Sequence, residues 1–423
     1  MQTQLSTAEI PYVYCEFAEL IGAEHWHKRV KKIKDEIRGF PFLKEHLTDE
    51  NEIVFQLDGL RTLQQRYGVW GRWHELGEQF YAAAALAAQV VSISKRLDAS
   101  MRNALVRRVH GALKNPDDMR GMRLELSIAT HFARSGQEIV WPEMEAKSET
   151  FDLLLPGMGQ EGLEIECKSI SRDKGSVITT REALVFFHHV SRQLQPMIKT
   201  LRAGIGIAVT VPDRLPAAHH DLASLAVDVA WQVRAAQSTV LPSGAQIRLV
   251  DFDASRLADL KDGMLESTAR SLMEDVTGTT NRHAMAIGGN TGGSFVVAVQ
   301  SSRDDTLFQA TFNVLGDAAR RQLTGRRAGV LIAGLHGLGP DQLMSVAGQD
   351  HTPGEPPTAL AWNVSDFLSS SARSHLVGLG FLSRSAMRTA AAGHLTDSGV
   401  AYHFPCPQSP YWHTDFQGMF PAT

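Results

Sequence analysis

Cysteine is scarce in this chain, which contains three in 423 residues. Cys15, Cys167 and Cys406 lie far apart in the sequence, so they match neither the spacing of a CxxC metal site nor a disulfide framework. We therefore expect three reduced thiols.

Long apolar runs are also missing. No stretch of about eighteen apolar residues occurs, and residues 1–4 do not begin the charged and then apolar pattern of a secretory signal. The sequence therefore predicts a cytoplasmic protein without a membrane span.

Several motifs of common enzyme classes do not occur. The chain contains no GxxxxGK[ST], GxSxG or HExxH sequence, which argues against P-loop ATPases, α/β-hydrolases and zincin proteases. The glycine-rich segment 288–293 precedes a predicted strand rather than a helix, so we do not expect it to bind phosphate at a helix N-terminus.

The charge of the chain is slightly negative. A formal net charge of −4 gives no overall attraction to nucleic acid, so phosphate binding would depend on local basic patches. One such patch is the run 27–34, which includes Lys31 and Lys32. Both a solvated helix face and a nucleic-acid contact remain open for these two lysines.

The periodicity of apolar residues divides the chain into three predicted regions. Residues 1–115 have helical spacing and predict an N-terminal helical domain. Residues 116–255 predict an α/β domain with a mixed sheet flanked by helices, and the strands over 204–211 and 246–252 are expected in that same sheet. Residues 256–423 predict a C-terminal α/β region, either a second region or an extension of the first sheet.

The most informative segment is residues 163–168, with the sequence LEIECK. Side chains alternate between the two faces of a strand, so Glu164, Glu166 and Lys168 share one face and the apolar residues share the other. Buried acids and ammonium groups are costly unless they are paired or bind an ion. This face is therefore typical of an ion site, with Glu164 either a substitute ligand or a solvated residue at its rim.

Two further acids extend this pattern. Asp152 precedes Glu166 by 14 residues, which is enough for a strand, a turn and a returning strand that bring both carboxylates side by side. Glu125 lies in a predicted helix among apolar neighbours, so it is either exposed at the edge of the packed face or part of the site. Carboxylate and carbonyl oxygens are the ligands that Mg²⁺ prefers. Lys168 could orient a water or stabilise charge on phosphate oxygens.

The order of Glu125 on a helix, Asp152 on a strand and residues 166–168 on the next strand resembles the PD-(D/E)XK nuclease superfamily. The resemblance covers residues 119–252 and implies the restriction-endonuclease-like fold. Phe151 stands where members of the family often have proline. The family implies a nuclease of bacterial genome defence or DNA processing, with nucleic acid as its partner.

The same resemblance implies a role for each residue. Asp152 and Glu166 would bind Mg²⁺ or Mn²⁺ together with the backbone carbonyl of Cys167. Lys168 would be the catalytic lysine, and Glu125 would be the accessory acid of the helix.

The motif itself is short. An acid-x-Lys tripeptide occurs at residues 145–147, 166–168 and 259–261. Only residues 166–168 end an alternating strand with an aspartate-bearing strand before it. The structural alternative is an exposed strand with a Glu–Lys ion pair.

The helix predicted over about 180–201 also carries polar side chains. The resemblance places this helix at the cleft, where Arg192 or Gln193 would contact phosphate. The adjacent His188 and His189 point in different directions on a helix, so we expect core or surface histidines rather than a metal pair.

These observations together predict a Mg²⁺-dependent nuclease that acts on DNA. The flanking regions would bind substrate, form a homo-oligomer or dock a partner protein. Two alternatives remain: a non-catalytic nuclease-fold scaffold that binds nucleic acid or protein, and an RNase on the same fold.

Overall fold

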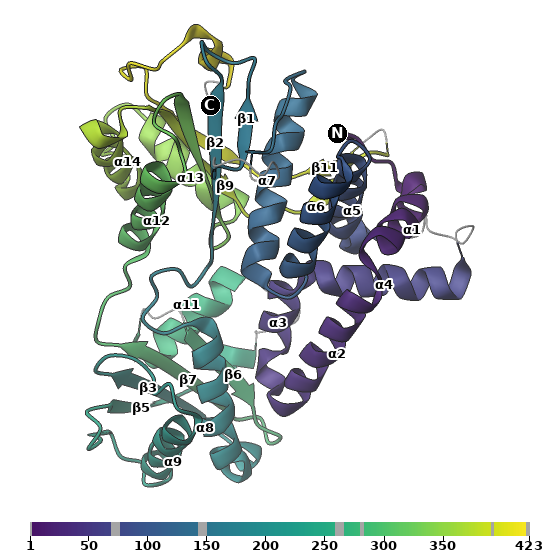
Figure 1. Cartoon of the computed structure of the whole chain (residues 1–423). Coiled ribbons are helices and arrows are strands. Elements are labelled where there is room, and N and C mark those ends of the chain that lie inside the picture. The colour runs from purple at the N-terminus through teal and green to yellow at the C-terminus, as the bar shows by residue number, and fades with distance from the viewer. Residues whose placement is uncertain are drawn as a thin grey trace. The chain divides into compact units, whose positions relative to one another are not determined.

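The computed structural model describes residues 2–68, 77–142, 150–258, 266–279, 283–390 and 393–419. The protein is of the α/β class, in which a helical region over residues 7–134 precedes mixed sheets flanked by helices (Figure 1).

The chain falls into two compact units, and each unit is assembled from separate segments. Unit 1 comprises Met1–Ile33, Glu50–Lys174 and Leu307–Thr423, and unit 2 comprises Lys34–Asp49 and Gly175–Thr306. The units therefore do not follow chain order, and the domain boundaries near residues 115 and 255 stay predictions.

The helical region of unit 1 packs around one buried helix, α5 (Tyr81–Ser94). The alanine-rich sequence of α5 is buried on nearly every side, which is typical of a helix at the centre of a core. Its neighbours in this core are α1 (Ile10–Ile21), the first part of α2 (Glu24–Gly39), α4 (Glu52–Tyr67), α6 (Ala99–Ala112) and α7 (Pro116–Arg134).

Side-chain caps begin two of these helices. The Asp98 carboxylate accepts a hydrogen bond from the backbone N–H of Met101 at 2.9 Å and caps α6. The Asn115 side chain accepts one from the N–H of Asp117 and caps α7, with Pro116 in its first turn. The cap and Pro116 therefore mark the start of α7.

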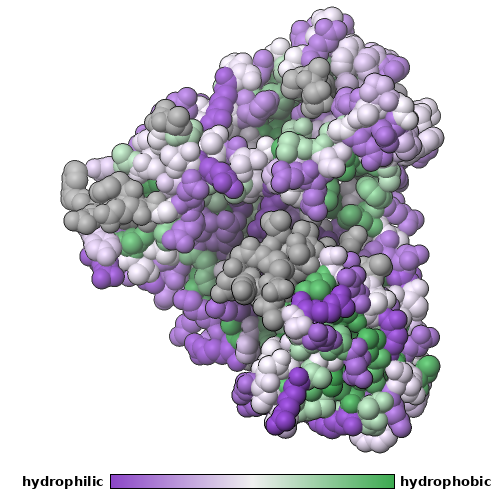
Figure 2. Space-filling model, turned by 180° about the vertical axis from the view of Figure 1, so that it is seen from behind, coloured by the Kyte–Doolittle hydropathy of each residue, from purple (hydrophilic) through white to green (hydrophobic). Residues whose placement is uncertain are grey.

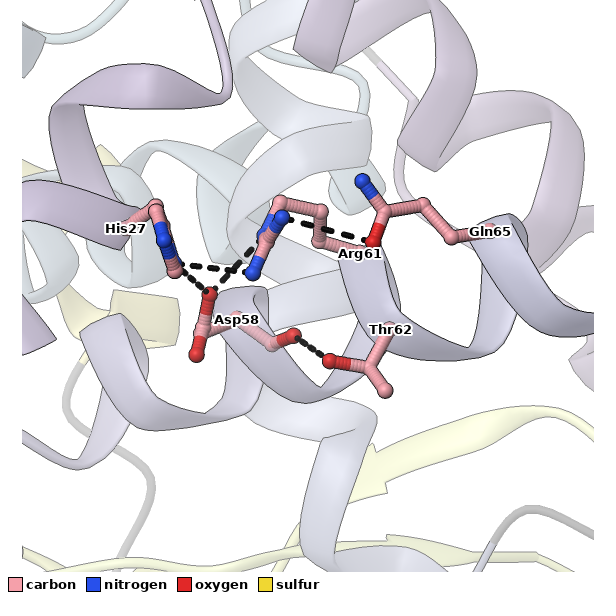
Figure 3. A network of polar contacts seen from close by, with 5 residues as sticks. All are labelled: His27, Asp58, Arg61, Thr62 and Gln65. Atoms are coloured by element: carbon pink, nitrogen blue, oxygen red, sulfur yellow. Dashed lines mark hydrogen bonds and ion pairs between the residues drawn. The ribbon is translucent and has the colours of Figure 1, made fainter.

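A polar network joins α2 to α4 inside unit 1 (Figure 3). Asp58 is buried, and its Oδ1 lies 3.0 Å from His27 Nδ1 and accepts a hydrogen bond from Arg61 Nε at 2.9 Å. Arg61 also contacts His27 Nδ1 at 2.8 Å and donates to Gln65 at 3.4 Å. The Asp58 carboxylate is therefore in contact with both His27 and Arg61.

The main sheet of unit 1 has five strands in the order β1-β2-β8-β9-β12. β1 pairs antiparallel with β2, β2 with β8 and β8 with β9 pair in parallel, and β9 pairs antiparallel with β12. The strands are β1 (Leu153–Leu155), β2 (Leu163–Ile170), β8 (Ala328–Leu335), β9 (Leu376–Ser383) and β12 (Ala401–Pro405).

Helices cover both faces of this sheet. On one face α7 packs its apolar side chains against Leu153, Ile165 and Cys167. On the other face α12 (Leu307–Arg321), α13 (Pro340–His351) and α14 (Ala359–Ser369) pack against residues such as Leu331 and Phe381. Burial on both faces explains why β8 reads as an almost continuous apolar run.

The strands over 204–211 and 246–252 do not join this sheet, so that part of the prediction is wrong. They form β3 (Gly204–Val211) and β5 (Gln246–Phe252) of a second five-stranded sheet in unit 2, with the order β4-β5-β3-β7-β6. The place beside β2 is taken by β8 from the C-terminal part of the chain, whose eight residues pair with the whole of β2.

The strand predicted after residues 288–293 is confirmed as β7 (Ser294–Ser301), which pairs antiparallel with β6 (His283–Gly288). It belongs to the second sheet, whereas the later strands β8, β9 and β12 extend the first sheet. The C-terminal region therefore contributes to both sheets, which settles the alternative that the sequence left open.

Unit 2 has its own core on both sides of the second sheet. The helices α8 (Thr180–Thr200) and α9 (His219–Arg234) cover one face, and α11 (Glu266–Thr277) packs through Val276 and its neighbours on the other. The remaining short elements of the chain are α3 (Lys44–Glu50), α10 (Ser255–Ala258), β4 (Thr239–Val240), β10 (Met387–Thr389), β11 (Leu395–Asp397), and the 3₁₀ turns Thr7–Glu9, Pro41–Leu43, Glu78–Phe80, Ser371–Arg373 and Thr414–Met419.

Hydrophobic and hydrophilic residues are mixed over the face of the molecule shown in Figure 2. Large hydrophobic side chains exposed on unit 2 include Val227, Trp231 and Val240. Within the described part of the chain, every helix is too short or too polar to cross a bilayer.

We predict that Asp58→Ala lowers the free energy of unfolding by about 3 kcal/mol, because it leaves the largely buried Arg61 guanidinium without its carboxylate. Chemical denaturation followed by circular dichroism measures this change. Glu16→Ala is the control, since its ion pair with Lys95 is exposed and should contribute less than about 1 kcal/mol. Equal losses in the two variants would contradict the assignment of Asp58 as a buried anchor.

Candidate active site

Asp152 lies directly before β1, at the edge of the main sheet of unit 1. Leu153 is paired with Ile165, so Asp152 falls beside Glu166 in the continuing register. Its side chain is 6% exposed, and its Oδ2 accepts a hydrogen bond from the backbone N–H of Cys167 at 2.7 Å. The two carboxylate-bearing positions are therefore neighbours across the strands, as the spacing of 14 residues predicts.

Glu166 and Lys168 lie on β2, one strand in from the edge formed by β1. Glu166 is fully buried, and its Oε1 accepts a hydrogen bond from Lys168 Nζ. Lys168 is 24% exposed at its side chain. In the parallel register with β8, Glu166 is paired with Leu331 and Lys168 with Ala333. Glu166 and Lys168 are two residues apart, so their side chains lie on the same face of β2.

Glu125 reaches the same group of charges from α7. Its Oε2 accepts a hydrogen bond from Arg108 Nη2 of α6 at 2.6 Å, in an ion pair that is mostly shielded from solvent. The Glu125 carboxylate also raises the pKa of Asp152. Arg108 belongs to a basic pair that sequence reasoning could not distinguish from a solvated helix face.

Burial raises the pKa of the Asp152 carboxyl well above its ordinary range, and the nearby carboxylates of Glu125 and Glu166 raise it further. The hydrogen bond from Cys167 and the charge of Lys168 oppose this shift without cancelling it. The Asp152 carboxyl is therefore buried and lies close to two other carboxylates.

The pKa of Lys168 is raised by a balance of opposite effects. Burial alone would lower it, but the charge of Glu166, the hydrogen bond to Glu166 and the charge of Asp152 together outweigh burial. Lys168 is thus an ammonium group at neutral pH, and it is the nearest positive partner that the buried acids have on β2.

The side chain of Cys167 lies on the opposite face of β2, among the residues that pack against α7. Burial and the charge of Asp152 raise the pKa of its thiol well above the ordinary value, so it is a neutral core residue. Its backbone N–H binds Asp152, while a role for its carbonyl as a metal ligand stays a prediction.

Within the described segments, no group of three or more His, Cys, Asp or Glu side chains is placed to hold one metal ion. The donor set that the resemblance implies, two carboxylates and a backbone carbonyl, stays a prediction. His188 and His189 of α8 stack against Phe40 of unit 2 in edge-on contacts at 5.2 and 6.0 Å between ring centroids. Both histidines therefore pack against an aromatic ring of their own unit.

The expectation of a solvated residue at the rim is wrong for Glu164, whereas its use as a substitute ligand stays a prediction. It is fully buried, and it accepts hydrogen bonds from the backbone N–H and hydroxyl of Thr324 and from Arg327 Nη1 at 3.2 Å. These partners lie in the loop between α12 and β8. No local sequence signal marks them, because they are far from Glu164 along the chain.

The expected nucleic-acid contacts are divided between the two units, and the candidate site lies in unit 1. Arg192 and Gln193 are exposed on α8, which packs on the second sheet in unit 2, so nothing assigns them to a cleft beside β2. Lys31 and Lys32 are exposed on α2 in unit 1. Their contact with nucleic acid stays a prediction.

The two other acid-x-Lys tripeptides, at residues 145–147 and 259–261, lie outside the described residues. Comparison of the chain with family models, with curated proteins and with solved structures found no match. The residues and their geometry are therefore the basis for any functional inference.

We predict that Glu164→Gln lowers the free energy of unfolding by about 3 kcal/mol, because Arg327 and Thr324 lose a buried charged acceptor. Urea denaturation measures the difference. Glu161→Gln is the matched control, since Glu161 is exposed in the turn before β2 and its replacement should stay within about 0.5 kcal/mol. A stable Glu164→Gln protein would favour a role for this acid in the site.

We also predict a pH effect from Asp152. An ordinary aspartate has a pKa of about 3.9, and the folded protein raises it, so folding favours the protonated carboxyl. The resulting stabilisation is complete below about pH 4 and is lost as the pH rises through the higher folded pKa. Asp152→Asn should therefore be more stable than the native protein at pH 7 and similar to it at low pH.

Urea denaturation between pH 4 and pH 8 measures this difference. Asp317→Asn is the control, because Asp317 is exposed beside Arg320 on α12 and should leave the pH profile unchanged. Native and Asp152→Asn curves that run parallel over the whole range would show that Asp152 is not destabilised in its ionised form.

Proposed function

We propose that this protein is a divalent-metal-dependent nuclease of the PD-(D/E)XK type, with the restriction-endonuclease-like fold and DNA as its substrate. The observation that supports this most is the meeting of Asp152, Glu166 and Lys168 at one edge of a mixed sheet, with Glu125 contributed by the preceding helix. These are the positions that carry the family resemblance, and they come from three separate elements.

The donor set fits a hard divalent cation. Asp152 and Glu166 offer carboxylate oxygens in a place where the acids destabilise each other's charge, and a cation of charge +2 would offset that repulsion. Asp152, Glu166 and the backbone carbonyl of Cys167 would hold it. When bound, Mg²⁺ or Mn²⁺ supplies polarisation of the phosphoryl oxygens and a lower pKa for the attacking water.

Lys168 would act through its charge. Since its pKa is raised, it carries a proton at neutral pH and is not a general base. Its ammonium donates to Glu166 in the free protein and would donate to the phosphoryl oxygens on which negative charge develops during hydrolysis. Arg cannot replace it with the same geometry, because the guanidinium is planar and longer.

Glu125 would be a positioning residue. Its charge raises the pKa of Asp152, while its own carboxylate is held by Arg108. The Arg108–Glu125 pair therefore fixes how strongly α7 opposes ionisation of Asp152. This gives the helix acid a role without direct contact with substrate.

We predict that the protein cleaves DNA in the presence of Mg²⁺ or Mn²⁺, and that Asp152→Asn, Glu166→Gln and Lys168→Ala each lower the rate at least about 100-fold. Gel electrophoresis of labelled duplex and single-stranded DNA, with matched RNA, measures the cleavage. Lys95→Ala is the control, because Lys95 is an exposed lysine of the helical region and should leave the rate unchanged.

Mn²⁺ titration calorimetry separates metal binding from catalysis. Binding should be lost in Asp152→Asn and Glu166→Gln and kept in Lys168→Ala, which retains both carboxylates. RNA cut in preference to DNA would favour the RNase alternative. Nucleic acid bound but left uncut with both metals would favour the scaffold and contradict the proposed activity.

A further inference from the structure

A group of basic side chains gathers where the three parallel strands of unit 1 end. Arg172 follows β2, His336 follows β8 and Arg384 follows β9. All three strands run in the same direction, so their carboxyl ends meet at one edge of the sheet. In parallel sheets this edge is where ligands commonly bind.

Backbone contacts hold these three segments together. The N–H of His336 donates to the carbonyl of Ile170 at 3.0 Å, and the N–H of Arg384 donates to the carbonyl of Leu338 at 2.8 Å. A Cβ atom added to Gly337 would lie 3.5 Å from Arg172 Cα. The segments that carry the basic residues are therefore in direct contact with one another.

The first turns of α7 add two more arginines to this edge. Leu124 of α7 packs against Gly334 at the end of β8, which places the preceding turn of the helix beyond the strand. Arg120 and Arg123 lie in that turn, and their charges act on His336. Residues after β2, β8 and β9 and residues of α7 therefore line this edge. All of them belong to unit 1.

Arginines from several segments of unit 1 lie at this edge, and two of them pair with the acids Glu50, Glu52 and Asp117. Burial, together with the charges of Arg120, Arg123 and Arg384, lowers the pKa of His336 to about 4 against the opposing charge of Asp117. Arg120 is engaged by Glu50 and Asp117, and it is 11% exposed. Arg123 has a longer contact of 3.5 Å with Glu52, and Arg172 and Arg384 are exposed.

The edge is close to the candidate active site. Lys168 stands two residues before the end of β2, and each strand residue advances about 3.3 Å, so the rim begins about 7 Å along the strand from Lys168. A nucleic-acid strand is a row of phosphates, and arginine forms paired hydrogen bonds with phosphate oxygens.

We propose that Arg123, Arg172 and Arg384 form a phosphate-binding rim that holds a nucleic-acid strand across the carboxyl ends of β2, β8 and β9. The proposal rests on the proposed function for the choice of nucleic acid as ligand. It assigns Arg120 a structural role, because the Arg120 side chain is only 11% exposed and pairs with both Glu50 and Asp117. It also places substrate binding in unit 1, on residues that the family resemblance does not name.

The test measures binding without cleavage. Affinity of the full chain for a fluorescent duplex and a fluorescent single strand is measured by anisotropy in EDTA over a range of salt concentrations. Arg172→Ala/Arg384→Ala should weaken binding at least about 10-fold at low salt and make the slope of log affinity against log salt shallower by about 2, since each lost phosphate contact changes it by about 1.

Two matched variants control for charge and folding. Arg96→Ala/Arg320→Ala removes the same charge from exposed positions elsewhere in unit 1 and should leave affinity and slope unchanged. Arg172→Lys/Arg384→Lys keeps the charge and should keep the slope. If the alanine variant fails to fold, Arg172→Gln/Arg384→Gln gives the same comparison.

The outcomes separate this proposal from the proposed activity. Binding that depends on the rim, with no cleavage when metal is added, would support the rim and reject the nuclease. Cleavage with unchanged affinity and slope in the alanine variant would reject the rim alone. Absence of binding by the native chain, or displacement of DNA by polyglutamate at equal charge concentration, would also overturn the rim as a nucleic-acid site.

Discussion

The hydrogen bond from the backbone N–H of Cys167 to Asp152 is the interaction on which the candidate site depends. It fixes the carboxylate that precedes β1 against the strand that carries Glu166 and Lys168. Without it, Asp152 would sit at the end of a strand of only three residues, with little else to orient it. The donor is a backbone N–H of β2. The strand itself therefore positions the Asp152 carboxylate, and no second side chain is needed for that bond.

In this position the buried Asp152 carboxyl lies close to the carboxylates of Glu125 and Glu166, where solvent stabilises their charges poorly. Burial already disfavours the ionised Asp152, and the charges of Glu125 and Glu166 add to the effect, while Lys168 opposes it. A structure maintained only for stability would gain by replacing such acids with apolar residues. A bound cation would offset the repulsion between these acids, as the proposed metal-dependent activity requires.

Two glutamates on one face of β2, Glu164 and Glu166, have partners at very different distances along the chain. Alternation along the strand puts Glu164 and Glu166 on the same side and cannot tell them apart. Thr324 and Arg327 bind Glu164 from the loop before β8, whereas Glu166 meets Lys168 two residues away. The first partnership is invisible in the sequence because it joins distant segments, and the second could be predicted because it is local.

The sequence by itself determined the helix around Glu125, the alternation of β2, the strand after residues 288–293, and the grouping of Asp152 with Glu166 and Lys168. These features depend on forces that act over a few residues or across one turn. Only the tertiary structure decided that β8 rather than β3 lies beside β2, that Glu164 is an internal anchor, and that basic segments converge at the strand ends. Strand neighbours are chosen by long-range packing of apolar faces, and many pairings satisfy the same local pattern.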